Sequence, residues 1–194
     1  VLVLGPSDGG SLHLFLDAGA SVITRSSCRN VSDAWGMALC ADFVIANTVV
    51  MARAVRALSG TAVPVLWWLH DAFAGYPHIA HQIPTQLGEN VRVYSVGSHA
   101  ANAMRAVEGI TNAEIVTFGR TDKSDYYVTE LNEEDTVCED FTVMYKGERV
   151  CRVSLRVPGE HNMMNALAAA AAAHGMGVDG EHIKKALEDF SGVH

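Results

Sequence analysis

The chain has 194 residues, of which 49% are hydrophobic and 19% charged, a composition that can bury the core of one large domain or two small ones. Its net charge is −8 and its 14 Lys and Arg residues are scattered, so we expect no nucleic acid partner. The run of mostly small residues at 163–173 is too short and too rich in alanine to span a bilayer, so we expect no transmembrane segment.

Short apolar runs alternate with helical stretches over the first 120 residues. Near-continuous apolar runs are typical of parallel strands that are buried on both faces. This alternation therefore predicts an α/β fold with a Rossmann-like, doubly wound parallel sheet. The predicted strands lie at 1–5, 20–24, 42–48, 63–70, 91–97 and 113–119. The predicted helices lie at 10–18, 32–40, 49–58, 76–87 and 98–107.

The pattern changes near residue 120, where apolar and polar residues begin to alternate. A turn at Lys146-Gly147 between two strand-like arms predicts a small antiparallel hairpin or three-stranded sheet, followed by two helices. The arms lie at 141–145 and 149–157, and the helices at about 160–174 and 180–190. We therefore predict two domains, 1–119 and 120–194.

The first predicted strand is followed by the loop GPSDGGS, in which Gly9 and Gly10 open a helix. Backbone N–H groups at a glycine-rich helix N-terminus can approach a phosphate or a sugar, which makes both glycines candidate substrate-binding residues. A tight turn between strand and helix explains the same glycines equally well.

His70 and Asp71 follow the predicted strand at 63–70, at the edge where open α/β sheets bind ligands. An Asp71 carboxylate that holds the His70 imidazole would suit general-base catalysis or the recognition of a hydroxyl group. The alternative is an aspartate that caps a helix beside a packed histidine.

His161, Asn162 and Asn165 share the first turn of the predicted helix at 160–174. A carboxamide offers a donor and an acceptor side by side, which matches the N6 and N7 edge of adenine. The alternative is that one asparagine caps the helix while the other is merely exposed. The later GMGVDG, at 175–180, matches G-x-G-x-x-G but follows a helix rather than a strand, so we interpret it as a helix C-cap and loop.

The four cysteines have no C-x-x-C spacing, and the nine histidines are scattered as well. This pattern predicts neither a zinc site nor the disulfide scaffold of a secreted protein, and no other metal ligands stand out.

No charged leader or initiating methionine precedes the apolar start VLVLG. We therefore expect a cytoplasmic protein that continues beyond both ends of this sequence.

Residues 155–193, LRVPGEHNMMNALAAAAAAHGMGVDGEHIKKALEDFSGV, resemble the end of the central domain of the Mur ligases of the UDP-N-acetylmuramate:L-alanine type. The preceding VTFGRTDKSDYYVTELN extends the resemblance to about residue 115. It implies an ATP-dependent ligase, with magnesium, that activates a carboxylate as an acyl phosphate for attack by an amine. It also implies that Asn162 and Asn165 contact the adenine of ATP, with His161 beside them. The family's P-loop, magnesium-binding glutamate and modified lysine have no counterpart in 1–119, so we expect no ligase activity from the isolated chain.

Residues 1–119 are similar to the N-terminal half of family-4 glycosyltransferases of the GT-B type, and the telling pieces are IANT at 45–48 and WWLHD at 67–71. The similarity implies an acceptor-side domain whose Gly9, Gly10 and His70 line the cleft of an enzyme that uses a nucleotide sugar. The second GT-B domain, with its E-x7-E motif, is not in this sequence.

Both families work in the biosynthesis of the cell envelope. We therefore predict a fragment of such an enzyme, Mur-ligase-like, with a small nucleotide or sugar nucleotide as its substrate. A glycosyltransferase domain and a non-catalytic binding module are the alternatives.

Overall fold

The structure is a computed structural model, and it describes residues 2–5, 16–17, 19–24, 36–70, 79–106, 114–131 and 139–192. Two sheets are present among these residues. A two-stranded parallel sheet consists of β1 (Leu2–Gly5) and β2 (Ser21–Thr24). A seven-stranded sheet has the order β3-β4-β5-β6-β7-β8-β9, so each strand pairs with the next one along the chain. The α/β prediction is confirmed.

Four parallel strands form one side of the seven-stranded sheet, with β3 at its edge: β3 (Val44–Asn47), β4 (Val65–Leu69), β5 (Val91–Val96) and β6 (Ile115–Phe118). Three further strands continue it: β7 (Tyr126–Thr129), β8 (Glu139–Tyr145) and β9 (Glu148–Leu155). β7 joins β6 in parallel through the single pair Phe118 and Tyr126, whereas β8 and β9 are antiparallel. All the predicted strands are therefore found, most with slightly shorter bounds, whereas β8 begins two residues before the predicted arm.

The helices are η1 (Val49–Met51), α3 (Ala52–Leu58), η3 (Ala80–Gln82), α5 (Gly97–Ala106), α6 (Glu160–Gly175) and α7 (Gly180–Asp189). The predicted helix at 10–18 falls largely outside the described residues, and that at 32–40 is described from residue 36, with residues 36–38 helical. The described part of the predicted helix at 76–87 holds only a short turn, so that prediction is wrong. Ile83 is extended (φ −68°, ψ 125°) because Pro84 disfavours the helical conformation in the residue before it.

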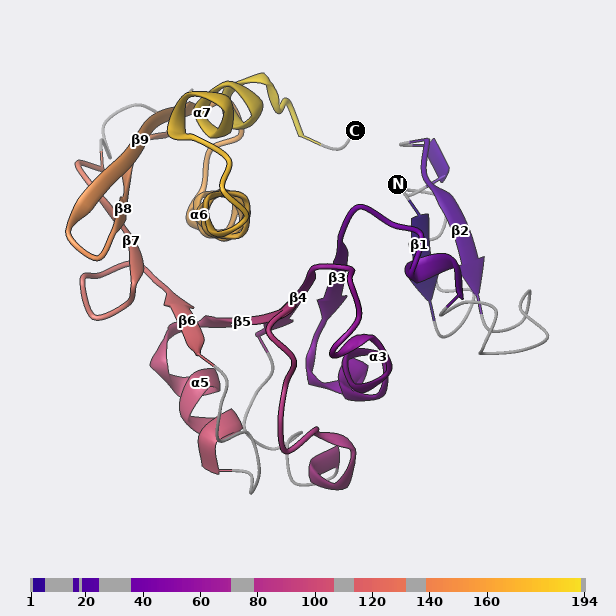
Figure 1. The fold of residues 1–194 in the computed structure, drawn as a ribbon. Helices are drawn as coiled ribbons and strands as arrows, with labels where there is room; N and C mark the ends of the chain where they lie inside the picture. The colour runs from indigo at the N-terminus through magenta and orange to yellow at the C-terminus, as the bar shows by residue number, and fades with distance from the viewer. Residues whose placement is uncertain are drawn as a thin grey trace.

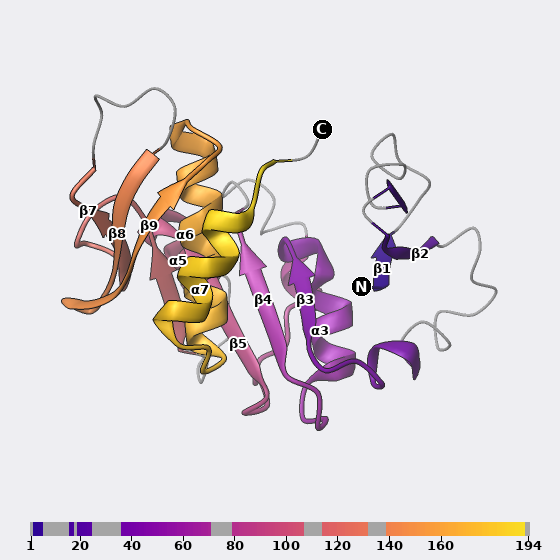
Figure 2. The same ribbon diagram turned by 90° about the horizontal axis from the view of Figure 1, so that it is seen from above.

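Helices cover both faces of the parallel strands. Figure 1 shows α3 and α5 on one face and α6 on the other, with β7–β9 curling round beside α6. Seen from above, α6 and α7 run next to each other across the sheet (Figure 2). The two faces bury separate apolar clusters: Trp67 packs in the cluster on the α3 side, and Leu66 in the cluster on the α6 side.

The alanines of α6 serve close packing. Ala170, Ala171 and Leu167 are completely buried, and Gly175 lies so close to the Tyr94 hydroxyl that a Cβ atom there would overlap it. Small side chains let the helix approach both the parallel strands and the antiparallel extension. The run of alanines therefore has a structural explanation.

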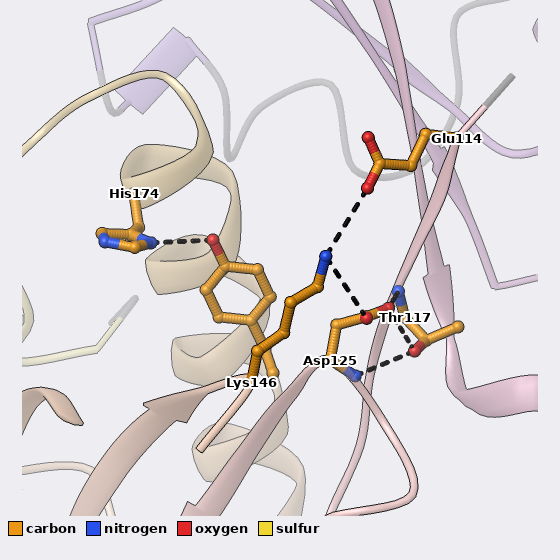
Figure 3. Close-up of polar contacts among 6 residues, drawn as sticks. Glu114, Thr117, Asp125, Lys146 and His174 are labelled. Carbon is orange, nitrogen blue, oxygen red and sulfur yellow. Dashed lines mark hydrogen bonds and ion pairs between the residues drawn. The ribbon is translucent and has the colours of Figure 1, made fainter. Parts of the chain in front are cut away.

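The predicted turn at Lys146-Gly147 is confirmed, because both residues have positive φ (48° and 90°), as a type I′ turn requires. Lys146 Nζ lies 3.6 Å from Glu114 Oε1 and 4.0 Å from Asp125 Oδ1. Asp125 Oδ2 in turn accepts hydrogen bonds from the backbone N and the Oγ1 of Thr117, both at 2.8 Å (Figure 3). These contacts connect β6 and β7 with the β8–β9 hairpin, and so link the segments before and after residue 120. The division into domains at 119/120 stays a prediction.

The GMGVDG segment is a helix end and loop, as predicted. Gly177 has φ +90°, and Asp179 caps α7 by accepting hydrogen bonds from the backbone N of Glu181 and of His182, both at 3.1 Å. These bonds and the His182 imidazole lower the pKa of Asp179 below its ordinary value. Among the described residues, no helix has the length and apolar character needed to cross a membrane.

Candidate functional site

The direction of α6 decides which predicted residues share one edge of the sheet. Arg120, just beyond the carboxyl end of β6, lies 2.8 Å from Glu160 in the first turn of α6. At the other end, Arg92 near the start of β5 donates a hydrogen bond to the carbonyl oxygen of Gly175. The helix therefore runs antiparallel to the strands, and its first turn lies at their carboxyl edge. This is the edge at which open α/β sheets bind ligands.

His70 lies at the same edge, directly after β4, and its side chain is exposed. Its Nε2 is 2.9 Å from Oδ1 of Asn47, the last residue of β3. The predicted partner of His70, Asp71, lies outside the described residues, as do Gly9 and Gly10. The structure thus places an asparagine from the neighbouring strand beside His70.

Thr48, next to Asn47, has an unusual backbone conformation, with φ 73° and ψ 162°. A β-branched residue rarely adopts positive φ, and such conformations cost about 1–3 kcal/mol. The conformation is held from β4, because the Thr48 N–H donates to the carbonyl of Trp68 at 2.8 Å and its carbonyl accepts from Trp67 Nε1 at 2.9 Å. The Thr48 hydroxyl is buried and has no hydrogen-bond partner among the described residues. Strain of this kind is concentrated at functional sites, which draws attention to this edge.

Three polar residues lie near the start of α6, and one of them, Asn162, forms a hydrogen bond within the protein. Asn162 Nδ2 donates to the Pro158 carbonyl at 2.9 Å, so this amide stabilises the start of its own helix. His161 and Asn165 are exposed, and their side chains have no hydrogen-bond partner in the described part of the chain. Asn165 is therefore the carboxamide that is free to pair with a base.

Two carboxylates lie at the start of α6. Glu139 Oε2 accepts a hydrogen bond from the Gly159 N–H at 2.6 Å, and Glu160 lies in the first turn. These carboxylates interact with the partial positive charge at the N-terminus of α6, and they would repel a phosphate. The turn is therefore better suited to a neutral base than to a phosphate chain. The described residues contain no group of three or more His, Cys, Asp or Glu that could hold a metal ion.

A cavity of about 380 Å³ lies at the opposite, amino edge of the sheet, with Arg92, Tyr94, Glu114 and Tyr126 in its lining. Two of its three charged groups already interact with the protein: Arg92 with Gly175, and Glu114 with Lys146. Burial raises the pKa of Tyr126, and the hydroxyl oxygen of this residue lies 2.8 Å from His174 Nδ1. The carboxyl edge thus remains the better candidate site.

The role of Asn47 was not predicted from the sequence. The register places Asn47 opposite Trp68, two residues before His70, so both side chains lie on the α6 face of the sheet. The IANT and WWLHD motifs each lie at the end of a strand, and this position was the sequence signal for Asn47 and His70. Which strands are neighbours could not be inferred from either motif.

Comparison with known proteins gives two kinds of match. The family model described as glycosyl-transferase family 4 matches residues 1–139. The UDP-N-acetylmuramate–L-alanine ligase of Caldanaerobacter subterraneus is 36% identical over 94 residues, which are 48% of this chain and 20% of that protein. The same ligase of Syntrophotalea carbinolica is 44% identical over 80 residues, 40% of this chain and 17% of that protein. The chain thus spans about a fifth of the length of these curated relatives.

Solved structures resemble the whole chain. The UDP-N-acetylmuramate–alanine ligase of Thermotoga maritima has a TM-score of 0.55 at 17% identity, covering 100% of this chain and 55% of that one. The UDP-N-acetylmuramate:L-alanyl-gamma-D-glutamyl-meso-diaminopimelate ligase from Neisseria meningitides also has a TM-score of 0.55, at 18% identity, covering 100% of this chain and 79% of that one. At these identities the likeness shows a shared fold.

Proposed function

The chain belongs to glycosyl-transferase family 4, and from this membership and its similarity to Mur ligases we propose that it is the nucleotide-binding part of a cell-envelope biosynthesis enzyme. The ligand in this proposal is ATP, and its adenine pairs with Asn165 in the second turn of α6. His161 lies beside the base, while Asn162 holds the turn in place through Pro158.

One observation carries the proposal: α6 runs antiparallel to the strands, so its polar first turn lies at the ligand-binding edge of the sheet. Asn165 is exposed in the next turn of the helix and offers both an N–H donor and a carbonyl acceptor. An adenine edge presents the complementary pair.

The described residues fit the base of ATP better than its phosphates. Glu139 and Glu160 place carboxylates at the N-terminus of α6, the end of a helix that otherwise attracts a phosphate, and no described group of side chains fits magnesium. The ATP phosphates and the ion would thus be held by parts of a longer enzyme. In this proposal the isolated chain binds the adenosine part and performs no ligation.

Replacement of Asn165 by leucine should weaken the binding of adenosine and of ATP about equally, by roughly two- to tenfold, because one set of hydrogen bonds is lost. Isothermal titration calorimetry on the 194-residue chain measures both affinities. Ala169, exposed one turn further along α6, provides the matched control, and Ala169→Gln should leave both affinities unchanged. Equal affinities of the wild type and Asn165→Leu for adenosine would contradict the proposal.

A second candidate function is supported by the family model and by the His70–Asn47 pair. The chain would then supply the acceptor-side half of a glycosyltransferase that uses a nucleotide sugar. His70, exposed at the carboxyl edge, would contact a hydroxyl of the sugar or its acceptor.

His70→Ala in a full-length parent enzyme should abolish sugar transfer and leave the melting temperature unchanged, because an exposed side chain adds little to stability. The measurement is transfer of radiolabelled sugar together with thermal unfolding. His81→Ala, at another exposed histidine of the described part, should retain full transfer. Full transfer by His70→Ala would reject this second function.

A further inference from the structure

Asn47 is the described side chain that holds the His70 imidazole. Its Oδ1 lies 2.9 Å from His70 Nε2, across neighbouring parallel strands. A carboxamide oxygen can only accept a hydrogen bond, so the contact requires the hydrogen of the neutral imidazole to be on Nε2. The other ring nitrogen, Nδ1, then keeps its lone pair.

We propose that Asn47 is a positioning residue that fixes His70 as the Nε2–H tautomer and so makes Nδ1 the hydrogen-bond acceptor for a ligand hydroxyl. The ligand class that this predicts is a hydroxyl-rich one, such as the sugar of a nucleotide sugar. The inference rests on the second candidate function above. It adds that Nδ1 is the atom of His70 that accepts the ligand hydrogen bond, and that Asn47 determines this.

The backbone after Asn47 supports this role. Thr48 is held in a strained conformation by hydrogen bonds to Trp67 and Trp68 of β4, the strand that leads directly to His70. Bonds on both sides of Thr48 fix the end of β3 against the end of β4. The ends of the two strands that carry Asn47 and His70 are thereby fixed against each other, which limits the positions that the two side chains can take.

The tautomer can be read directly by two-bond ¹H–¹⁵N correlation NMR on the 194-residue chain, with His70 assigned from a His70→Gln spectrum. In wild type we expect a ratio of Nε2–H to Nδ1–H roughly two- to tenfold above that of an unstructured histidine peptide, the bias that one exposed hydrogen bond gives. Asn47→Leu should return the ratio to the peptide value. Asn47→Asp, which keeps an acceptor oxygen, should retain the bias.

The control is His81, whose Nε2 lies near the Gln82 amide nitrogen, so its signals should not change in either Asn47 variant. A wild-type ratio equal to the peptide value, a predominance of Nδ1–H, or an unchanged ratio in Asn47→Leu would each overturn the proposal. Unchanged thermal unfolding of the variants excludes a general loss of structure.

A titration with UDP-glucose separates this inference from the function on which it rests. If the sugar binds as proposed, the His70 Nδ1 signal shifts in wild type, and the midpoint moves to higher concentration in Asn47→Leu. If UDP-glucose leaves the Nδ1 signal unchanged, the ligand role of Nδ1 is contradicted, whereas the second candidate function is tested separately by sugar transfer in the full-length parent enzyme. The tautomer ratios then still decide whether Asn47 positions His70.

Discussion

Leu167→Ala is expected to lower the free energy of unfolding by about 2–5 kcal/mol, because it opens a cavity in a tightly packed cluster. Leu167 is completely buried on α6, in the same cluster as Leu66 of β4 and Phe141 of β8. Its loss therefore affects strands on both sides of residue 120. We expect one cooperative transition in urea, followed by circular dichroism and by tryptophan fluorescence, with both probes shifted equally.

The matched control on the same helix is Ala169→Gln, which should change stability by less than about 0.5 kcal/mol, because residue 169 is exposed. Trp67 and Trp68 of β4 report on the N-terminal part, whereas most of the helical signal in the C-terminal part comes from α6 and α7. Two separate transitions, with Leu167→Ala shifting part of the circular dichroism change and leaving the tryptophan fluorescence transition in place, would contradict a shared core. That result would support two independent domains divided near residue 120.

Gly180→Ala is expected to destabilise the protein by roughly 3 kcal/mol, at the upper end of the cost of overpacking. A Cβ atom at residue 180 would overlap the carbonyl oxygen of Val150 in β9. Backbone cannot rotate away as a flexible side chain can, so α7 would have to move away from the sheet. Chemical unfolding measures the loss, and the affinity of the remaining folded protein for adenosine should be unchanged.

Gly177, in the same loop, provides the comparison. Its φ is +90° and a Cβ atom added there would meet no atom within 4 Å, so its constraint comes from the backbone conformation alone. Asparagine tolerates this region better than other residues with side chains, so Gly177→Asn should cost less than about 1 kcal/mol. A cost for Gly180→Ala no greater than that of Gly177→Asn would show that α7 does not pack on β9 as described.

Much of the fold could be predicted from local pattern. Apolar runs indicated the strands, the Lys146-Gly147 pair indicated the turn, and the alanine-rich segment indicated α6, because each depends on the conformational preferences of consecutive residues. The predicted helix over 76–87 is wrong in its described part, and Pro84 is the local signal that was given too little weight.

The candidate site was predictable in its residue types but not in its arrangement. His70 and Asn165 were identified from their positions after a strand and at a helix start. Asn47 was not, because its contact with His70 depends on β3 and β4 being neighbours in a particular register. Contacts between residues far apart in the chain depend on strand order, which neither segment encodes by itself.

The sequence by itself determined the strands, most of the helices, the hairpin turn and the polar first turn of α6, since these follow from short-range backbone and side-chain preferences. Only the tertiary structure decided that α6 runs antiparallel to the strands and that β7 joins β6 across residue 120. It also decided that Asn47 rather than a neighbouring residue of the same strand meets His70. The physical reason is that burial of two apolar faces selects among the possible packings of these elements, and that selection depends on the whole chain.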